Sequence, residues 1–309
     1  MTERPAAPAG YSWHDIVLPG SRRLEVLSGG PENGFPLVFH SGTPSGAAAL
    51  PLLVEPAAER GLRTITYSRP GYGTSTAARG RTVADAAADT AAVLGSLGYG
   101  EDSAFVTVGW SGGGPHALAC AALLADRCRG TAVIAGVAPF DGEGLDWSAG
   151  MAAENLMEFD VARAGGEEFE AFLSFASEMM AAVTDPSTVA EALGGLVTEH
   201  DKEALRVSGL AEYMIAGLQQ AILVGTAGWR DDDAAFMSPW GFRPGDIHQG
   251  VSIWQGSEDR MVPVAHGRWL AANIASSQLE IAEGEGHLST VPIAVPHLLD
   301  DLVAAGPGR

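Results

Sequence analysis

The sequence predicts an α/β protein in which a mostly parallel sheet is flanked by helices and interrupted by a long helical insertion. Apolar runs of strand length alternate with helical patterns from about residue 36 onward, which is typical of right-handed β-α-β units. The alternation stops near residue 140 and returns near residue 246, and helical patterns fill the interval. We therefore expect a core of residues 1–140 and 246–309, with residues 141–245 forming a helical cap over one end of the sheet.

The strands of the first half are short apolar or β-branched runs that end in Pro, Gly or other small residues. Two runs across a Pro-Gly-Ser turn predict an N-terminal hairpin of residues 12–17 and 23–27. Further strands are expected at residues 36–41, 63–67, 104–108 and 131–137. Thr82 is expected to cap a helix that runs to Leu97, because the apolar residues there recur at i, i+4 spacing. An Ala-rich helix is expected to end near Asp126.

The second half of the chain is interpreted from the same patterns. Within the insertion, residues 167–183 and 187–196 have helical periodicity. After the insertion we expect strands at residues 251–255 and 278–282, and helices at residues 264–275 and from Ile293 onward. The return of the alternation favours one sheet built from both ends of the chain.

The charge and composition of the chain exclude several classes of partner. Its 309 residues include 18 Lys plus Arg against 38 Asp plus Glu, so the net charge is −20 and a phosphate backbone would be repelled. Two cysteines cannot form a disulfide framework, the first ten residues lack the apolar segment of a secretory signal, and no apolar run is long enough to cross a bilayer. We expect a cytoplasmic protein with a short unstructured leader and with neither nucleic acid nor membrane as partner. The oligomeric state is left open.

The central motif is GWSGG at residues 109–113, which stands where a buried strand turns into a helix. A nucleophilic serine needs a sharp, strained turn there, so that its hydroxyl projects at the carboxyl edge of the sheet. Small residues two positions before and after the serine let the neighbouring backbone pass. The alternative is a Gly-rich packing turn, which the motif alone does not exclude. The strand before it and the helix after it favour a nucleophile at Ser111.

Through this motif and two later ones, the chain resembles the α/β-hydrolase family, whose order is Ser, acid, His. GEGHLS at residues 284–289 places His287 after the last expected strand. GSEDRMVP at residues 256–263 places Asp259 after the preceding strand. The resemblance implies the α/β-hydrolase fold, with a mostly parallel eight-stranded sheet, and a catalytic triad of Ser111, Asp259 and His287.

In that triad, Ser111 would attack a carbonyl carbon and His287 would take its proton and return it to the leaving group. Asp259 would hold the imidazole tautomer and stabilise the imidazolium. Two other carboxylates are alternative acids. Glu258 adjoins Asp259 in the same loop, and Asp141 follows the strand before the insertion, where some members of the family carry the acid.

The resemblance also implies an oxyanion hole made of two backbone N–H donors. Gly112 follows the nucleophile at a helix N-terminus and supplies one donor. HSGTP at residues 40–44 resembles the family's His-Gly-X-Pro loop, with Ser41 where the His often stands, and we assign the second donor to Thr43. This offset leaves two interpretations of His40, which either orients the loop or is a core histidine.

Other polar motifs are interpreted as structural. SRPGYG at residues 68–73 resembles the family's turn after the second parallel strand, and Arg69 is expected to bridge loops there. No histidine spacing such as H-E-x-x-H indicates a metal site. The run Glu199-His200-Asp201 is interpreted as polar surface, and Cys120 and Cys128 as small hydrophobes. We expect neither a metal nor a cofactor.

The resemblance covers about residues 12–140 and 245–309 and assigns no counterpart to the insertion, so the substrate is the least determined feature. Its aromatic and Met residues are expected to form the core of the cap and, in part, the roof of a pocket. They are Met151, Met157, Phe159, Phe169, Phe172, Phe175, Met179 and Met180, with Trp147, Trp229 and Trp240. An apolar pocket in an acidic chain favours a neutral or cationic substrate.

The leading hypothesis is a serine hydrolase that cleaves a small-molecule carboxylic ester, thioester or lactone through an acyl-enzyme. A perhydrolase side activity is compatible with the same triad. One alternative is an aminopeptidase similar to proline iminopeptidases, in which cap carboxylates hold the amine of the substrate. The candidates are Glu154, Glu158, Asp160, Glu167 and Glu168, although the loop at residues 40–44 departs from those peptidases' His-Gly-Gly-Pro-Gly. The other alternative is a non-catalytic small-molecule receptor on the same scaffold.

Overall fold

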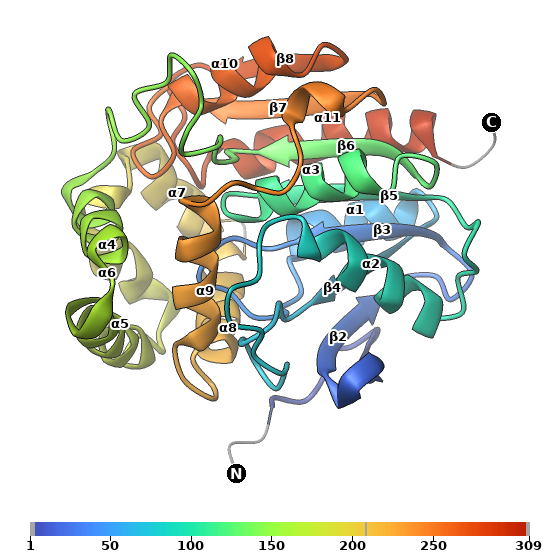
Figure 1. Cartoon of the computed structure of the whole chain (residues 1–309), viewed down its shortest axis with the longest axis horizontal. Coiled ribbons are helices and arrows are strands. Elements are labelled where there is room, and N and C mark those ends of the chain that lie inside the picture. Colours follow the sequence, from blue (N-terminus) through green and yellow to red (C-terminus); the bar gives the residue numbers. More distant parts are fainter. Residues whose placement is uncertain (1–3, 208, 307–309) are drawn as a thin grey trace.

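A computed structural model describes residues 4–207 and 209–306 of the chain. The ends of the expected core segments, residues 1–3 and 307–309, lie outside the described residues. In the described part, eight strands form one sheet in the order β1-β2-β4-β3-β5-β6-β7-β8 (Figure 1). They are β1 (Tyr11–Val17), β2 (Arg23–Gly29), β3 (Phe35–His40), β4 (Leu62–Tyr67), β5 (Phe105–Trp110), β6 (Cys128–Ile134), β7 (Val251–Gly256) and β8 (Ser277–Ala282).

The sheet is parallel except at one edge. β2 pairs antiparallel with both β1 and β4, whereas all pairs from β4 through β3 to β8 are parallel. Both ends of the chain contribute strands to this one sheet, because β7 pairs with β6 across the insertion. The expected α/β fold with a mostly parallel eight-stranded sheet is confirmed.

Helices cover both faces of the sheet, as the alternation of side chains along a buried strand requires. They are α1 (Pro51–Glu59), α2 (Asp85–Ser96), α3 (Gly113–Leu123), α10 (Val264–Asn273) and α11 (Thr290–Ala305). In β3, Leu37 and Phe39 belong to the hydrophobic cluster that includes residues of α1 and α11. Val38 points the other way, into the cluster of α2, α3 and α10.

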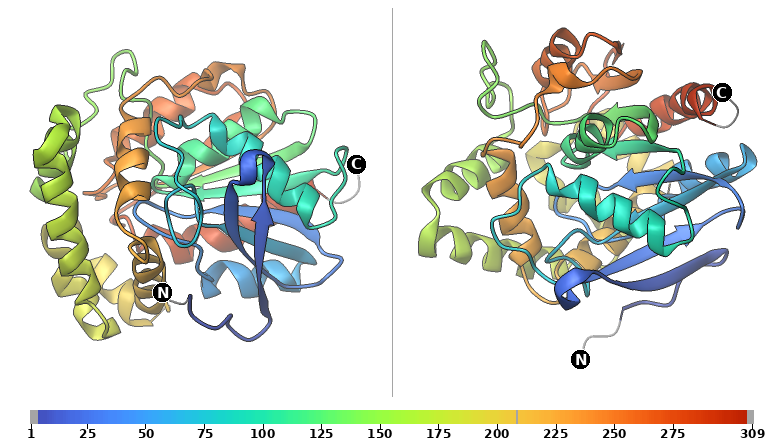
Figure 2. Two further views of the ribbon diagram at one scale, coloured as in Figure 1. Left: turned by 60° about the horizontal axis from the view of Figure 1, so that its bottom comes forward. Right: turned by 45° about the vertical axis from the view of Figure 1, so that its right-hand side comes forward.

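The insertion, residues 141–245, contributes α4 (Ala153–Ala164), α5 (Gly166–Ala181), α6 (Val189–Leu193), α7 (Glu199–Val207), α8 (Leu210–Ala221) and α9 (Ala227–Phe236). Short 3-10 turns lie at Pro19–Ser21, Pro186–Thr188, Gly194–Leu196 and Pro244–Asp246. The six helices gather at the end of the sheet where the parallel strands finish, and Figure 2 shows α9 between the sheet and the outer pair α4 and α5.

The later helices of the insertion share the core of the sheet. Leu210 and Tyr213 of α8 belong to the same buried cluster as Val108 of β5. Phe236 of α9 belongs to the cluster on the opposite face, with Val133 of β6. The insertion is therefore packed into the sheet domain through its second half. No helix in the described chain combines the length and the apolar character that a membrane span requires.

Several expected element boundaries are wrong. The helix expected to begin at Thr82 begins at Asp85, and Thr82 donates both its N–H and its hydroxyl to the Asp85 carboxylate, at 2.7 and 3.0 Å. The strand expected at residues 131–137 ends at Ile134, because Ala135 adopts a φ of 48°, which strand pairing does not accommodate. The last helix begins at Thr290 rather than Ile293.

Candidate active site

Ser111 lies in the sharp turn between β5 and α3, and its φ of 56° places it in the left-handed region. Its N–H donates to the carbonyl of Ile134 in β6 at 2.9 Å, and its own carbonyl accepts from Gly114 at 2.9 Å. A Cβ on Gly109 would lie 2.4 Å from the carbonyl oxygen of Gly113, so only glycine fits there. The motif forms the strained strand-to-helix turn that the sequence indicates.

His287 and Asp259 form a buried, hydrogen-bonded pair. The imidazole Nδ1 lies 2.7 Å from Oδ2 of Asp259. Oδ1 of Asp259 accepts the backbone N–H groups of Met261 and Val262 at 2.9 and 2.8 Å, and Gln255 donates to Oδ2 at 3.0 Å. Because a carboxylate holds Nδ1–H, the other ring nitrogen, Nε2, is left as the proton acceptor.

The charge state of His287 follows from its surroundings. Burial alone would lower the pKa of His287, but the Asp259 carboxylate outweighs burial and raises that pKa above its ordinary value, with a further contribution from Asp201. The two alternative acids do not reach the imidazole. Glu258 and Asp141 are both exposed, whereas Asp259 is buried, because neighbouring side chains in a loop point in different directions.

One cavity of about 990 Å³ brings the serine and the histidine together. Ser111, His287 and Trp110 line it, and the ring of His287 stacks on Trp110 at a centroid distance of 5.9 Å. Trp110 is the residue before Ser111, so this stacking holds the imidazole beside the turn that carries the hydroxyl.

The two expected oxyanion donors also meet in this cavity. Thr43 and Gly112 both line it, and a Cβ on Gly112 would lie 2.5 Å from Oγ1 of Thr43. Among the described residues, no hydrogen bond engages the backbone N–H of either residue. His40, in contrast, lies in the core with its ring against Tyr67 and His116. Burial holds the pKa of His40 well below its ordinary value, so this side chain is a neutral core histidine.

Arg69 bridges loops, as expected, and its main partner was not expected. It donates to the carbonyl oxygens of Ser41 and Gly42 at 2.7 and 2.9 Å, which are backbone atoms of the loop that carries Thr43. It also forms an ion pair of 2.6 Å with Asp232 of α9. The Thr43 hydroxyl donates to the same carboxylate at 2.7 Å. A carboxylate from the insertion therefore holds the loop of the candidate oxyanion hole.

Asp232 is fully buried and ionised. Burial would raise its pKa, but the guanidinium groups of Arg69 and Arg81 outweigh burial and hold that pKa far below its ordinary value. Arg81 lies 2.7 Å from the carboxylate, and the hydroxyl of Tyr72 donates to it at 2.9 Å. Sequence reasoning missed this residue. The available signal was its helical spacing of three and four residues from Trp229 and Phe236, which indicates a position on the apolar face of the helix.

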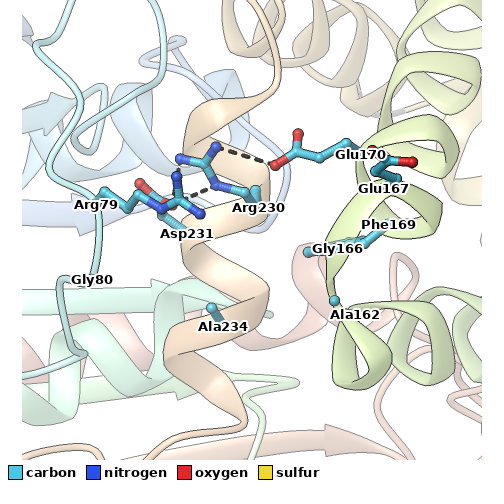
Figure 3. Close-up of a pocket in the computed structure, with 11 residues that line it drawn as sticks. Arg79, Gly80, Ala162, Gly166, Glu167, Phe169, Glu170, Arg230, Asp231 and Ala234 are labelled. Carbon is cyan, nitrogen blue, oxygen red and sulfur yellow. Dashed lines mark hydrogen bonds and ion pairs between the residues drawn. The ribbon is translucent and has the colours of Figure 1, made fainter.

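The consecutive aspartates of α9 point in three directions. Asp231 faces a groove of about 680 Å³ on the outer side, shown in Figure 3, where Arg230 pairs with Asp231 and reaches across to Glu170 of α5. Asp232 faces the loop of Thr43. Asp233 lines the large cavity, together with Trp229 and Phe236 at helical spacing.

Asp233 and Glu158 form a carboxyl pair in the wall of the large cavity. Neither oxygen of Asp233 accepts a hydrogen bond from an N–H or hydroxyl group of the described residues, while Glu158 accepts from the Trp229 indole at 2.6 Å. Burial raises the pKa of Glu158 to about 7. Burial and then the neighbouring Glu158 raise the pKa of Asp233 well above its ordinary value. Two neighbouring buried carboxyl groups retain a proton between them.

The structure separates the cap carboxylates named from the sequence. Glu154 and Glu158 line the large cavity. Asp160, Glu167 and Glu168 are exposed and lie outside its lining, and Glu167 borders the groove of Figure 3 instead. The described lining includes no Lys or Arg.

The aromatic and Met residues of the insertion divide in the same way. The cavity is lined by Met151, Met157, Phe159, Phe172, Phe175, Met179, Met180 and Trp229. Phe169, Trp147 and Trp240 are instead buried in hydrophobic clusters, away from the cavity lining. Most of these side chains therefore form the roof of the cavity, and a minority form the core of the insertion.

The interpretation of Glu199-His200-Asp201 as polar surface is wrong for Asp201. Its side chain is fully buried, and Oδ1 accepts the N–H groups of Leu288 and Ser289, which follow His287. The sequence offered one signal for this, because Thr198 and Asp201 have the spacing of a helix capping box.

The cysteines are buried, unpaired thiols. Burial raises the pKa of Cys128 to about 11 and raises that of Cys120 further, so neither is a thiolate at neutral pH. In the part of the chain that the structure describes, no three His, Cys, Asp or Glu side chains are grouped so that they could hold a metal ion.

A parallel sheet with a strained strand–Ser–helix turn at its carboxyl edge, covered by inserted helices, defines a protein of the α/β-hydrolase class. The chain belongs to the Alpha/beta hydrolase family, whose sequence profile matches residues 37–305. It is therefore assigned as a hydrolase. No curated protein matches the chain by sequence.

Solved structures share this fold at low sequence identity. A bromoperoxidase from Bacillus anthracis matches with a TM-score of 0.65 and 20% identity, over 95% of this chain and 99% of that one. The esterase RhEst1 from Rhodococcus sp. ECU1013 matches with a TM-score of 0.61 and 18% identity, over 94% and 99%. A thermophilic esterase from Thermogutta terrifontis matches with a TM-score of 0.59 and 20% identity, over 94% and 99%.

Proposed function

We propose that the protein is a serine hydrolase that cleaves a small-molecule carboxylic ester, thioester or lactone through an acyl-enzyme. The observation that carries the proposal is that His287, which is hydrogen-bonded to the buried Asp259, lines the same cavity as Ser111 in its strained turn. A hydroxyl at such a turn, an imidazole with a free ring nitrogen and a buried carboxylate are the groups that acyl transfer requires.

In this mechanism, Ser111 attacks the carbonyl carbon while Nε2 of His287 accepts the hydroxyl proton. The acyl C–O bond of an ester or lactone, or the C–S bond of a thioester, breaks as His287 returns that proton to the leaving oxygen or sulfur. Water then repeats the sequence on the acyl-enzyme and releases the acid. The N–H groups of Thr43 and Gly112, which no described residue occupies, would hold the oxyanion of both tetrahedral intermediates.

The lining of the cavity supports a neutral or cationic substrate. Its walls are mostly apolar side chains, many of them Met or aromatic, with carboxyl groups and no Lys or Arg among the described lining residues. An anionic substrate would meet carboxylates without a compensating cation, which costs free energy in an apolar cavity.

The test is hydrolysis of p-nitrophenyl acetate and butyrate by wild type and Ser111→Ala, with intact mass measured after a fluorophosphonate probe. We expect turnover, a single adduct on Ser111, and a rate in the variant at least about 10⁴-fold lower. Retention of most activity by Ser111→Ala would refute the mechanism. An adduct without turnover of any ester would favour a receptor on the same fold.

The carboxyl pair of Glu158 and Asp233 favours a second candidate, an aminopeptidase acting on a substrate with a free amine. Both carboxyls line the same cavity as Ser111, and an ammonium group would supply the donors that Asp233 lacks. Hydrolysis of aminoacyl-naphthylamides by wild type and Glu158→Gln, compared with aryl esters, separates the two functions. The aminopeptidase predicts amide turnover that falls in Glu158→Gln while ester turnover persists.

A further inference from the structure

Asp201 connects α7 of the insertion to the loop that carries His287. Its carboxylate is fully buried, and Oδ1 accepts the N–H groups of Leu288 and Ser289, each at 2.8 Å. These are the two residues directly after His287, and Ser289 is the N-cap of α11. One side chain of the insertion therefore holds the backbone on which the imidazole is mounted.

The second oxygen of Asp201 belongs to the start of its own helix. Oδ2 accepts the N–H of Thr198 at 2.9 Å, while the N–H of Asp201 donates to the Thr198 hydroxyl at 3.1 Å. This reciprocal pair is a capping box at the N-terminus of α7. The N-termini of α7 and α11 thus converge on one carboxylate, and the positive end of each helix dipole favours its ionised form.

The loop is shaped to admit this carboxylate. A Cβ on Gly286 would lie 2.1 Å from Oδ2 of Asp201, so a side chain there would displace it. Gly286 also donates its N–H to the Ser289 hydroxyl at 2.8 Å, which keeps the loop closed over the contact. The glycine before His287 therefore leaves the space that the Asp201 carboxylate fills.

The charge of Asp201 acts on the imidazole. Burial would raise the pKa of Asp201, but hydrogen bonds from the backbone of Thr198, Ser289 and Leu288 outweigh burial and lower that pKa. The charged groups that face His287 are Asp259, from the loop after β7, and Asp201, from α7. Glu285, from the same loop as His287, pairs with the exposed His200 at 3.6 Å.

We propose that Asp201 is a positioning residue through which the insertion fixes the orientation of His287 and stabilises its imidazolium form. The proposal rests on the proposed function, in which His287 is the general base. It makes α7 a part of the catalytic apparatus rather than a cover over it. Displacement of α7 would then lower the reaction rate even with Ser111, Asp259 and His287 unchanged.

The test compares Asp201→Asn with wild type and with Glu203→Gln, an exposed acid-to-amide change on the same helix. The readouts are kcat/KM on p-nitrophenyl butyrate and the rate of fluorophosphonate labelling, both against pH. Both rates rise as His287 loses its proton. Removal of the neighbouring negative charge lowers the pKa of His287, so the acidic limb moves to lower pH. We expect that movement, with about a tenfold lower plateau rate and an unchanged KM.

Glu203→Gln is expected to match wild type both in the plateau rate and in the pH at which the acidic limb of the profile lies. A merely structural role of Asp201 would lower the melting temperature without moving the limb. An Asp201→Asn protein whose acidic limb coincides with that of wild type would therefore overturn the proposal. If Asp201→Asn does not fold, Thr198→Ala replaces it. That variant keeps the carboxylate and loosens the capping box, and we expect about threefold slower labelling with the limb in place. Unchanged labelling in Thr198→Ala would overturn the proposal.

Failure of the proposed function would show separately. Wild type would then give neither ester turnover nor an adduct on Ser111. In that case the imidazole of His287 is titrated by NMR in wild type and Asp201→Asn, which needs no reaction. A lower pKa of His287 in the variant would support the coupling to α7, and identical titrations would overturn it.

Discussion

The inner helices α7–α9 and the outer helices α4–α5 both adjoin the candidate active site, but they contact it in different ways. The inner helices place buried carboxylates on the backbone and side chains of two site loops, Asp201 on the loop of His287 and Asp232 on the loop of Thr43. The outer helices contribute apolar cavity walls such as Phe175 and Met179, which are 65% and 59% exposed. The inner half of the insertion therefore belongs to the machinery of the site, and the outer half shapes the space for a substrate.

The packing of the two halves differs in the same sense. Most of α9 is buried, whereas within the described chain α4 has no buried residue and α5 buries only Phe169 and Leu173. An element with few buried contacts opens locally at a lower free-energy cost. We therefore expect the outer pair to tolerate substitution and the inner helices to resist it.

The largest loss of activity is expected for Asp259→Asn, which lies outside the insertion and serves as the reference for variants in both halves. The amide cannot hold the Nδ1–H tautomer of His287, so ester turnover should fall about 10⁴-fold while the fold is retained. Steady-state kinetics and circular dichroism check this. Asp141→Asn, at an exposed position, should match wild type, and an equal loss in both variants would refute the assignment of the acid.

The inner half should show the largest loss of stability. Asp232→Asn leaves the buried guanidinium groups of Arg69 and Arg81 without their counter-charge, so the free energy of unfolding should fall by about 3–5 kcal/mol. Urea denaturation measures this. The matched control in the outer half is Asp160→Asn, whose exposed pair with Arg163 should leave stability unchanged. Similar losses in the two variants would break the distinction between the halves.

The carboxyl pair joins the two halves, because Glu158 comes from α4 and Asp233 from α9. The raised pKa of about 7 for Glu158 means that the pair gains negative charge as the pH rises through neutrality. Preference for a cationic over a neutral ester should therefore increase about tenfold from pH 6 to pH 8 in wild type. Glu158→Gln should remove that dependence. If the rates for both esters changed with pH in parallel in wild type, the carboxyl pair would not control the preference for a cationic substrate.

The smallest effect is expected at the outer edge of the cavity. Phe175→Ser removes apolar surface that a substrate would cover, so KM for p-nitrophenyl butyrate should rise about threefold with kcat unchanged. Val17→Ser in β1, with the same 65% exposure but far from the cavity lining, serves as the control. A fall in kcat for Phe175→Ser would show that the outer helices also act on the chemistry.

Sequence reasoning located the fold and the candidate residues of the site because their signals are local. The motifs around Ser111, Asp259 and His287 each stand at a strand end. In the structure Ser111 and His287 line one cavity, and Asp259 is hydrogen-bonded to the imidazole. The errors lie at boundaries and in the insertion. Thr82 does not cap α2, because the nearby Asp85 carboxylate accepts its N–H group. Asp201 is not a surface residue, because its carboxylate accepts the N–H group of Leu288, which is distant in the sequence.

The three aspartates at positions 231–233 show why the burial and pairing of individual acids could not be predicted from the sequence. Their side-chain chemistry is identical, yet Asp231 pairs with Arg230 on the outer groove, Asp232 is ionised between two guanidinium groups, and Asp233 holds a proton with Glu158. The strained serine turn at the edge of a parallel sheet could be predicted from the amino-acid sequence, because strand, glycine and helix patterns act over a few residues. Which acids are buried, charged and hydrogen-bonded to the site loops depends on contacts between segments far apart in the chain, so the folded structure was needed to identify them.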